Sequence, residues 1–185
     1  MRGARSLDQV GEEPAGLRGR RGRAEAGACA VARVGREREL RHQQQPAAHV
    51  EVAGHVIGSI EQGVLALIGV QRDDGPADAE RLLERVLGYR IFADAEGRMN
   101  LSLRDVHGGL LLVPQFTLAA DTRNGTRAGF STAAPPAEAR RLFTHLVERA
   151  RAAHAPVGTG EFGADMQVAS VNDGPVTFWL ATPSP

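Results

Sequence analysis

Two polar side chains, Gln115 and Thr117, stand at the end of an otherwise apolar segment and are the first candidates for chemistry. We predict a buried strand over Leu110–Leu118, in which side chains alternate between two faces, so Gln115 and Thr117 share one face. An amide and a hydroxyl in such a place need hydrogen-bond partners or cost about 1 to 3 kcal/mol each. The partner is either nearby backbone or a substrate, and the segment alone leaves both open.

Nucleophilic catalysis by Thr117 would require a base beside its hydroxyl. The nearby sequence offers Asp121 and His107 but contains no recognised nucleophile motif. The six histidines are scattered, with no metal-ligand spacing and no cysteine cluster, and no glycine-rich phosphate pattern follows a strand. We therefore expect neither a metal site nor a cofactor.

The segment Ala120–Pro136 is a long loop between a predicted strand and a predicted helix. Loops of this length in a compact domain are usually functional or mobile. Its two cations, Arg123 and Arg127, are either solvated loop charges or a grip on a phosphate or terminal nucleotide. The sequence of the loop does not choose between these readings.

The stretch "VNDGPVTFWL" begins with an Asn-Asp-Gly turn signal, followed directly by Pro175. By local rules Asn172–Pro175 is a hairpin turn with a proline at the start of the next strand. The alternative is that Gly174 and Pro175 form part of an active site.

The elements that must position these groups follow from the hydrophobic periodicity. Apolar residues at helical spacing predict one helix from Pro76 to Gly88 and a second over residues 135–154. Short apolar segments predict strands, with hairpins around Ala53-Gly54 and around residues 95–97. The last two, "GADMQVASV" and "VTFWLA", are expected to pair and close the sheet. The predicted fold class is α/β: a single layered domain of mixed or antiparallel, barrel-like sheets with two main helices on one side.

Composition limits the ways in which this chain can bind nucleic acid. Of its 185 residues 42% are hydrophobic, and no apolar run approaches the roughly 18 residues of a membrane span. Residues 1–48 hold ten arginines against six acidic residues, whereas residues 49–185 hold twelve against sixteen. The main body would therefore have to bind a nucleic acid locally, not through a broad basic face. We expect a cytoplasmic location, because the sequence shows no secretory signal and Cys29 has no second cysteine to pair with.

The first 46 residues look unlike the rest of the chain. They are rich in arginine, glycine, alanine and glutamate and lack a sustained apolar period. We interpret residues 1–46 as an atypical extension, disordered or misassigned, and residues 47–182 as the functional domain. A nucleic-acid-binding arm is the alternative for the extension, because of its excess of positive charge.

Four segments together resemble one enzyme family: "QFTLAADT", the Gly-x-Arg loop that ends in Phe130, "FGADMQV" and "VNDGPVTFWL". They are similar to the D-aminoacyl-tRNA deacylases, also called D-tyrosyl-tRNA deacylases, and the resemblance runs from about Ala48 to Leu180. It implies a homodimeric editing enzyme that hydrolyses the ester between a D-amino acid, or misattached glycine, and the terminal adenosine of a tRNA. It also implies that L-aminoacyl-tRNA is left intact.

The resemblance also implies roles for individual residues. The family's catalytic motif falls on Gln115, Phe116 and Thr117, whose backbone would hold the substrate carbonyl while the tRNA's own 2′-hydroxyl assists the chemistry. Its Asn-x-Gly-Pro-x-Thr motif contains the chiral selector, a cis Gly-Pro bond that reaches into the partner subunit's pocket. The positions of that motif are Asn172, Gly174, Pro175 and Thr177. Four further positions would support or border the substrate pocket: Phe162, Met166, Arg127 and Phe130.

Two departures from the family pattern qualify these expectations. Proline occupies position 114, where the family has serine, and it removes a backbone donor. The family arginine that supports the Gly-Pro loop falls on Gln44, and we expect the apolar first strand around it to be missing. A catalytically weakened dimeric binding protein on the same scaffold is therefore the alternative to an active deacylase, and a conventional esterase that uses Thr117 is a third reading.

Overall fold

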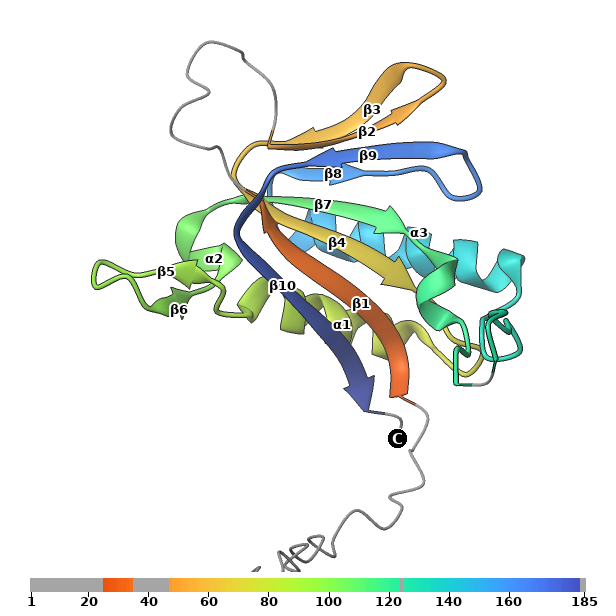
Figure 1. Cartoon of the computed structure of the whole chain (residues 1–185). Helices are drawn as coiled ribbons and strands as arrows, with labels where there is room; N and C mark the ends of the chain where they lie inside the picture. The colour runs from red at the N-terminus through yellow and green to blue at the C-terminus, as the bar shows by residue number, and fades with distance from the viewer. Residues whose placement is uncertain (1–24, 35–46, 124, 184–185) are drawn as a thin grey trace, which may run out of the picture.

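The computed structural model describes residues 25–34, 47–123 and 125–183. Within them the chain forms one mixed five-stranded sheet, a three-stranded antiparallel sheet, a two-stranded hairpin and helices (Figure 1). The elements are β1 (Glu25–Val34), β2 (Ala48–Val52), β3 (His55–Ile60), β4 (Gly63–Gly69), α1 (Pro76–Gly88), β5 (Phe92–Ala93), β6 (Met99–Leu101), α2 (Leu103–Val106), β7 (Gly109–Pro114), the 3-10 helix η1 (Phe116–Ala119), α3 (Pro136–Ala153), β8 (Val157–Thr159), β9 (Met166–Ser170) and β10 (Asn172–Pro183).

The five-stranded sheet has the order β10-β1-β4-β7-β8. Strand β1 is antiparallel to both β10 and β4, while β4, β7 and β8 run parallel to one another. The expectation that a core strand is missing from the N-terminal part is therefore wrong. Residues 25–34 supply that strand, and the sheet begins before residue 47. The remainder of the predicted extension, residues 1–24 and 35–46, lies outside the described residues.

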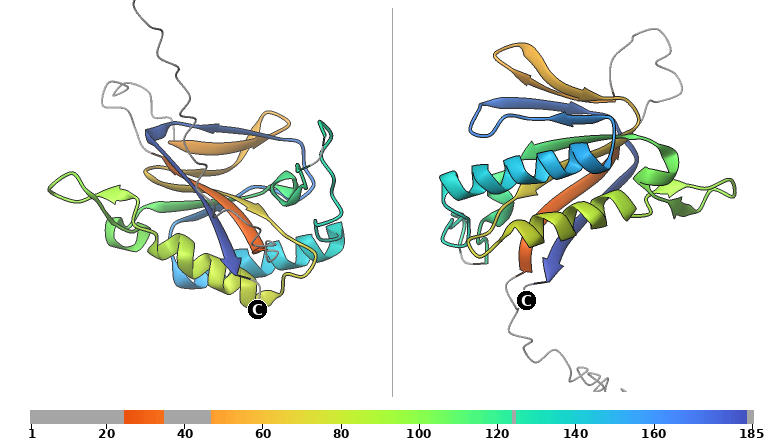
Figure 2. Two further views of the ribbon diagram at one scale, coloured as in Figure 1. Left: turned by 60° about the horizontal axis from the view of Figure 1, so that its bottom comes forward. Right: turned by 180° about the vertical axis from the view of Figure 1, so that it is seen from behind.

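Helices cover one face of the five-stranded sheet and the small sheet covers the other (Figure 2). The alternation predicted for β7 is confirmed: Leu110 and Leu112 belong to the core on the helix side, whereas Leu111 and Val113 belong to the core on the other side. The second core is completed by residues of β2 and β3 such as Val50 and Ile60. A sheet buried on both faces explains the continuous apolar runs of β4 and β7.

The two long helices lie where the periodicity predicted them. Helix α1 begins at Pro76, whose missing N–H costs nothing in the first turn, and Asp78 Oδ2 accepts a hydrogen bond of 2.9 Å from the backbone N–H of Gly75. Helix α3 begins at Pro136 in the same way. Their predicted apolar stripes are buried against the sheet: Leu82, Leu83, Val86, Leu87, Leu142, Phe143, Leu146 and Val147.

Two expectations about the sheets are corrected. Strands β9 and β10 do not pair: β9 joins β2 in the small sheet, and β10 joins β1 in the large one. The large sheet consequently stays open, with β10 and β8 as its edges, and it is not a barrel. The hairpins around Ala53-Gly54 and residues 95–97 are confirmed, and positive φ values of 49° and 78° make the first a tight turn. No helix in the described ranges is long and apolar enough to cross a bilayer.

The position of β1 predicts how Cys29 reacts. Its side chain is fully buried between α1 and the sheet, and burial raises the pKa of its thiol well above the ordinary value. Because the thiolate is the reactive form, we expect iodoacetamide to label the native protein roughly 100-fold more slowly than the unfolded protein. Mass spectrometry with and without guanidinium measures the ratio. Equal labelling rates in the two states would mean that β1 does not occupy the core.

Candidate functional site

Strand β7 ends earlier than predicted, and the chain turns there into the candidate catalytic motif. The backbone N–H of Gln115 donates to Ile68 O at 2.7 Å, which is the last bond from this segment to β4. The chain then forms η1, in which Leu118 N donates to Gln115 O at 3.2 Å. The prediction of a strand through Leu118 is wrong beyond Pro114. The turn lifts Phe116 and Thr117 out of the sheet and exposes both side chains.

Gln115 and Thr117 are neighbours, as predicted, but the turn and not a strand face brings them together. Gln115 Nε2 donates to Thr117 Oγ1. The two candidate bases lie elsewhere. The Asp121 carboxylate accepts two hydrogen bonds from the Arg123 guanidinium, at 2.8 and 2.6 Å, and these bonds hold the pKa of the carboxyl well below its usual range. His107 precedes β7, at the end of the strand opposite to Thr117.

A pocket of about 480 Å³ opens beside η1, and we call it the η1 pocket. Three phenylalanines line it, and the ring centroids of Phe116 and Phe130 are 5.3 Å apart. The long loop after η1 brings Phe130 there, because Asp121 and Gly129 exchange backbone hydrogen bonds of 2.7 and 2.9 Å. A hydrogen bond of 2.6 Å from Thr132 Oγ1 to Ala119 O fixes the loop to η1. A site of this size with aromatic walls suits a planar ring system.

The remaining predicted pocket residues divide into those that line the η1 pocket and those that do not. Phe162 lines it, and so does Pro114, at the family's serine position. Met166 does not line it: its sulfur accepts from Glu161 N at 3.3 Å, and its side chain packs against the second core. Arg127 is exposed and is not among the lining residues, so its role stays a prediction.

Sequence reasoning missed two arginines close to the η1 pocket. Arg72 is one of its lining residues, and Arg140 lies over the ring of Phe162, with its Cζ atom 5.0 Å from the ring centroid. Both are ordinary surface arginines in the sequence, the first in a turn and the second on a helix. No local signal could have distinguished them from the other arginines.

The Asn-x-Gly-Pro-x-Thr motif forms a closed loop at the start of β10. Asn172 Nδ2 donates to Thr177 Oγ1 at 2.9 Å, and Val176 N donates to Asn172 Oδ1 at 3.1 Å. Gly174 has φ +133°, a conformation that side chains disfavour. The prediction of a cis bond before Pro175 is wrong in this structure: among the described residues a cis bond occurs at Ala155–Pro156, and the Gly174–Pro175 bond is not cis.

Arg33 supports this loop from the neighbouring strand. Its Nε donates to Asp173 O at 2.9 Å and its Nη1 donates to Ile91 O at 3.3 Å, while only 14% of its side chain is exposed. A Cβ on Gly174 would come within 2.8 Å of Arg33 Nη2, so the two groups are in close contact. The position expected for the supporting arginine, Gln44, lies outside the described residues. The triplet Ala32-Arg33-Val34 was the signal that could have located it, because this arginine follows the short apolar run Cys29–Ala32.

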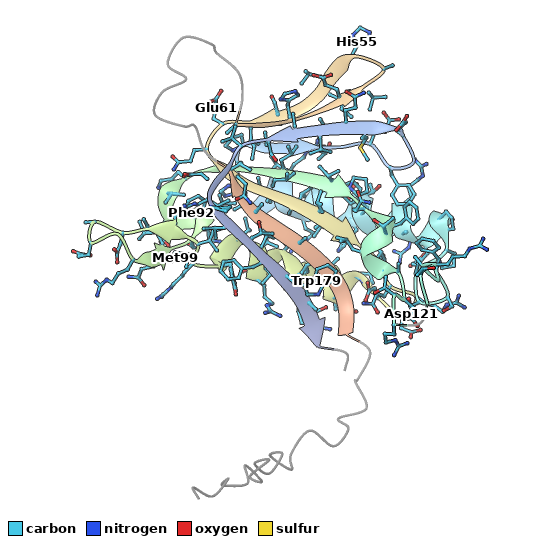
Figure 3. The ribbon with its side chains drawn as sticks, viewed as in Figure 1. His55, Glu61, Phe92, Met99, Asp121 and Trp179 are labelled. Atoms are coloured by element: carbon cyan, nitrogen blue, oxygen red, sulfur yellow. The ribbon has the colours of Figure 1, made fainter. Side chains whose placement is uncertain are left out.

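Strand register places this loop and η1 at opposite ends of one sheet. Asn172 is opposite Val34, Val34 is opposite Gly63, and Gly63 is opposite Gly109, the first residue of β7. η1 begins just after the other end of β7, roughly 15 to 20 Å farther along the strand direction at about 3.3 Å per residue, and β7 is itself three strands away from β10. Figure 3 shows the same separation, with Asp121 beside η1 and the start of β10 on the far side. Within one chain the two motifs therefore do not meet.

Comparisons with known proteins point to one family. The family model described as D-Tyr-tRNA(Tyr) deacylase matches residues 42–181. A curated D-aminoacyl-tRNA deacylase of Pseudomonas fluorescens (strain Pf0-1) is 61% identical over 140 residues, which are 76% of this chain and 97% of the relative. A deacylase of the same name from Thioalkalivibrio sulfidiphilus (strain HL-EbGR7) is 63% identical over 143 residues, 77% of this chain and 96% of the relative.

Two solved structures have a similar fold. One, titled "c-Myc DNA Unwinding Element Binding Protein", has a TM-score of 0.75 and 32% identity, and the match covers 85% of this chain and 99% of that one. The other, titled as a probable eukaryotic D-amino acid tRNA deacylase, has a TM-score of 0.60 at 16% identity, with 84% and 99% covered, and shows likeness of fold alone. The first structural match covers 85% of this chain, whereas the first sequence match covers 76%. A larger share is expected for the structural match, because β1 belongs to the fold although it lies before residue 42.

The contacts of Arg33 give a prediction about stability. Arg33→Gln removes the donors to two backbone carbonyls, so we expect the free energy of unfolding to fall by about 1 to 3 kcal/mol in a denaturant titration. Arg104→Gln is the matched control, because its partner Glu84 is exposed and the loss should stay below about 0.5 kcal/mol. Equal losses in Arg33→Gln and Arg104→Gln would refute the role given to Arg33.

Proposed function

The chain belongs to the D-Tyr-tRNA(Tyr) deacylase family, and from this premise we propose that it is a D-aminoacyl-tRNA deacylase. It hydrolyses the ester between a D-amino acid, or misattached glycine, and the terminal adenosine of a tRNA in the cytoplasm. The observation that carries the proposal is the turn from Gln115 into η1, which places Phe116 in the wall of an aromatic pocket, with Gln115 and Thr117 on either side of it in the chain. These three residues are the proposed catalytic group.

The η1 pocket is suited to the terminal adenosine. Bases are commonly bound by stacking on aromatic side chains, at about 1 to 3 kcal/mol per base. Phe116 and Phe130 are 60% and 45% exposed, so both rings are open to a ligand. Phe162 supplies a third aromatic wall. Arg127, in the exposed part of the same loop, is proposed to contact the bound nucleotide.

The start of η1 provides the groups that stabilise developing charge. The first N–H groups of a helical turn have no partner within the turn, so those of Phe116 and Thr117 can donate to the substrate carbonyl. Such donors contribute about 10²- to 10³-fold to the rate when a carbonyl oxygen becomes negative. The 2′-hydroxyl of the terminal ribose then assists the attack on the ester, and no protein nucleophile is required.

A protein nucleophile is the weaker reading of this geometry. Thr117 Oγ1 accepts from the Gln115 amide, which cannot remove a proton. The Asp121 carboxylate is bonded to Arg123, and its lowered pKa makes it a poor base. His107 lies at the other end of β7.

The chiral selector is proposed to come from a second copy of the chain. Gly174 and Pro175 are exposed, and the closed loop from Asn172 to Thr177 holds their backbone in place. A rigid backbone beside the substrate's α-carbon rejects an L side chain by collision, whereas a D side chain or hydrogen has free space. Because the loop and η1 lie at opposite ends of one sheet, only a partner subunit can bring them together.

Two features support a homodimer. Strand β10 is an edge of the large sheet and β9 is an edge of the small one, and each edge presents unpaired backbone groups. Both also carry exposed apolar side chains: Trp179 on β10 is 53% exposed and Val168 on β9 is 39% exposed. Trp179 lies on the face of β10 opposite to Leu180, away from the helices (Figure 3). Exposed apolar groups along edge strands are typical of association surfaces.

A dimeric binding protein with weakened catalysis is the second candidate. Its support is Pro114 in the wall of the η1 pocket and the 32% identical structure whose title names a DNA-element-binding protein. Proline removes one backbone donor from this wall. It leaves the N–H groups of Phe116 and Thr117 in place, so the deacylase reading takes precedence.

The proposal predicts the outcome of a deacylation assay. The protein should release D-tyrosine from D-tyrosyl-tRNA at least about 100-fold faster than L-tyrosine from L-tyrosyl-tRNA. Thr117→Ala should retain measurable activity, whereas a tRNA that ends in 2′-deoxyadenosine should be a poor substrate, because the ribose hydroxyl assists the chemistry.

The same assay separates the alternatives. Binding of tRNA without loss of the D ester would favour the binding protein. If Thr117→Ala abolished turnover while the 2′-deoxy substrate still reacted, Thr117 would be the nucleophile and the proposed chemistry would be wrong.

A further inference from the structure

The described arginines divide into those with an oxygen partner and those without. Nine donate to a carboxylate, amide or carbonyl oxygen: Arg33, Arg81, Arg85, Arg90, Arg98, Arg104, Arg123, Arg141 and Arg149. The other four, Arg72, Arg127, Arg140 and Arg151, have no such side-chain bond within the described ranges. Arg72 lines the η1 pocket, and Arg140 and Arg151 line a second hollow next to it. The unpaired arginines thus concentrate around the proposed site.

This second hollow, which we call the α3 trough, has a volume of about 460 Å³. It lies between α3, which is in front in the right-hand view of Figure 2, and the segment that follows β8. Arg140 and Arg151 are eleven positions apart, close to three full turns, so they share one face of α3 at a separation of about 16 Å. The hydroxyl of Thr144 lies between them on the same face.

Phe162 joins the α3 trough to the η1 pocket, because its ring lines both. The Arg140 guanidinium lies over this ring at 5.0 Å, which positions a cation at the boundary between the two hollows. A base that stacks in the η1 pocket would therefore have its own phosphate linkage close to Arg140. A chain that continued along α3 would reach Thr144 and then Arg151.

The α3 trough has no net charge, but two of its positively charged groups are not paired with a carboxylate. Glu148 and Glu161 line it as well, so its net charge is zero, yet neither is bonded to Arg140 or Arg151. Helix α3 instead pairs two other arginines with carboxylates: Arg141 with Glu138 and Arg149 with Glu80. The guanidinium groups of Arg140 and Arg151 remain available for bidentate contact with phosphate oxygens. The carboxylates of Glu148 and Glu161 repel phosphates elsewhere in the trough.

We propose that the α3 trough binds the phosphodiester backbone of the unpaired nucleotides that precede the terminal adenosine, with Arg140 and Arg151 as the phosphate-binding residues. The inference rests on the proposed function, which places that adenosine in the η1 pocket. It also explains how a body with more acidic residues than arginines holds a nucleic acid: a few uncompensated guanidinium groups follow one strand away from the site.

The experiment compares esters that differ in phosphate content. D-Tyrosyl-adenosine has no phosphate, D-tyrosyl-CpCpA has two phosphodiesters, and D-tyrosyl-tRNA has the full backbone. For the double variant Arg140→Gln/Arg151→Gln we expect KM to rise about 10- to 100-fold for the trinucleotide and the tRNA, with kcat unchanged. KM for D-tyrosyl-adenosine should stay within about 2-fold of the wild type. The salt dependence of uncharged tRNA binding should become shallower by about 1.4 in log-log slope, since each single-strand contact contributes about 0.7.

The matched control is Arg141→Gln/Arg149→Gln, which removes the same charge from the same helix but from paired arginines. Its KM values should remain within about 2-fold of the wild-type values. Its log-log salt slope should remain within about 0.5 of the wild-type slope. An equal loss in the control, an unchanged double variant, or an equal rise in KM for D-tyrosyl-adenosine would overturn the proposal. If the wild type hydrolyses none of the esters, the proposed function fails, and the binding slopes alone still decide whether the α3 trough holds phosphates.

Discussion

The pairing of β1 on both of its edges is the interaction on which the rest of the structure depends. Seven residues of β1 are opposite β4 and most of the same residues are opposite β10, so β1 connects the C-terminal strand to the parallel part of the sheet. It also brings Arg33 against Asp173 and next to Gly174. Without β1, β10 would lose its neighbour in the large sheet and the closed loop from Asn172 to Thr177 would lose its support.

The second constraint is the direction of the strands. Because β4 and β7 are parallel, η1 leaves the sheet at the end opposite to the start of β10. The aromatic pocket and the free N–H groups of η1 lie at one end of the sheet, while the closed Gly-Pro loop stands exposed at the other. This separation gives a physical reason for a two-chain site, since each copy can offer one end to the other.

Much of the fold could be predicted from the sequence because its signals are local. Helices α1 and α3, the tight turn at Ala53-Gly54 and the alternation in β7 each depend on short-range periodicity or turn chemistry. Two features could not be predicted in this way. Strand β1 is separated from β2 by residues 35–46, so the supporting arginine was expected directly before Ala48, at Gln44, instead of at Arg33. The partners of β9 and β10 depend on tertiary packing.

The candidate site was predicted in part. Gln115 and Thr117 are neighbours and Phe116, Phe130 and Phe162 share a pocket, but the change from strand to η1 at Gln115 had no sequence signal. The cis bond expected at Gly174–Pro175 was inferred from the family resemblance and not from the local sequence. In this structure the bond is not cis. Arg140 is free to bind a ligand because no carboxylate lies close enough to pair with it among the described residues. This depends on the tertiary structure and cannot be read from the sequence of the helix.

The most direct test of the account asks whether η1 of one chain meets the Gly-Pro loop of another. The single native cysteine is buried, so Thr117→Cys and Asp173→Cys variants can be mixed, allowed to exchange subunits and treated with a short bismaleimide. We predict a covalent dimer in the mixture and not in either variant alone, because the two positions lie more than about 20 Å apart within a chain, at about 3.3 Å per residue along β7 and about 4.8 Å per strand across the sheet. Absence of the covalent dimer, or an efficient link within one chain that carries both substitutions, would contradict a site built from two subunits.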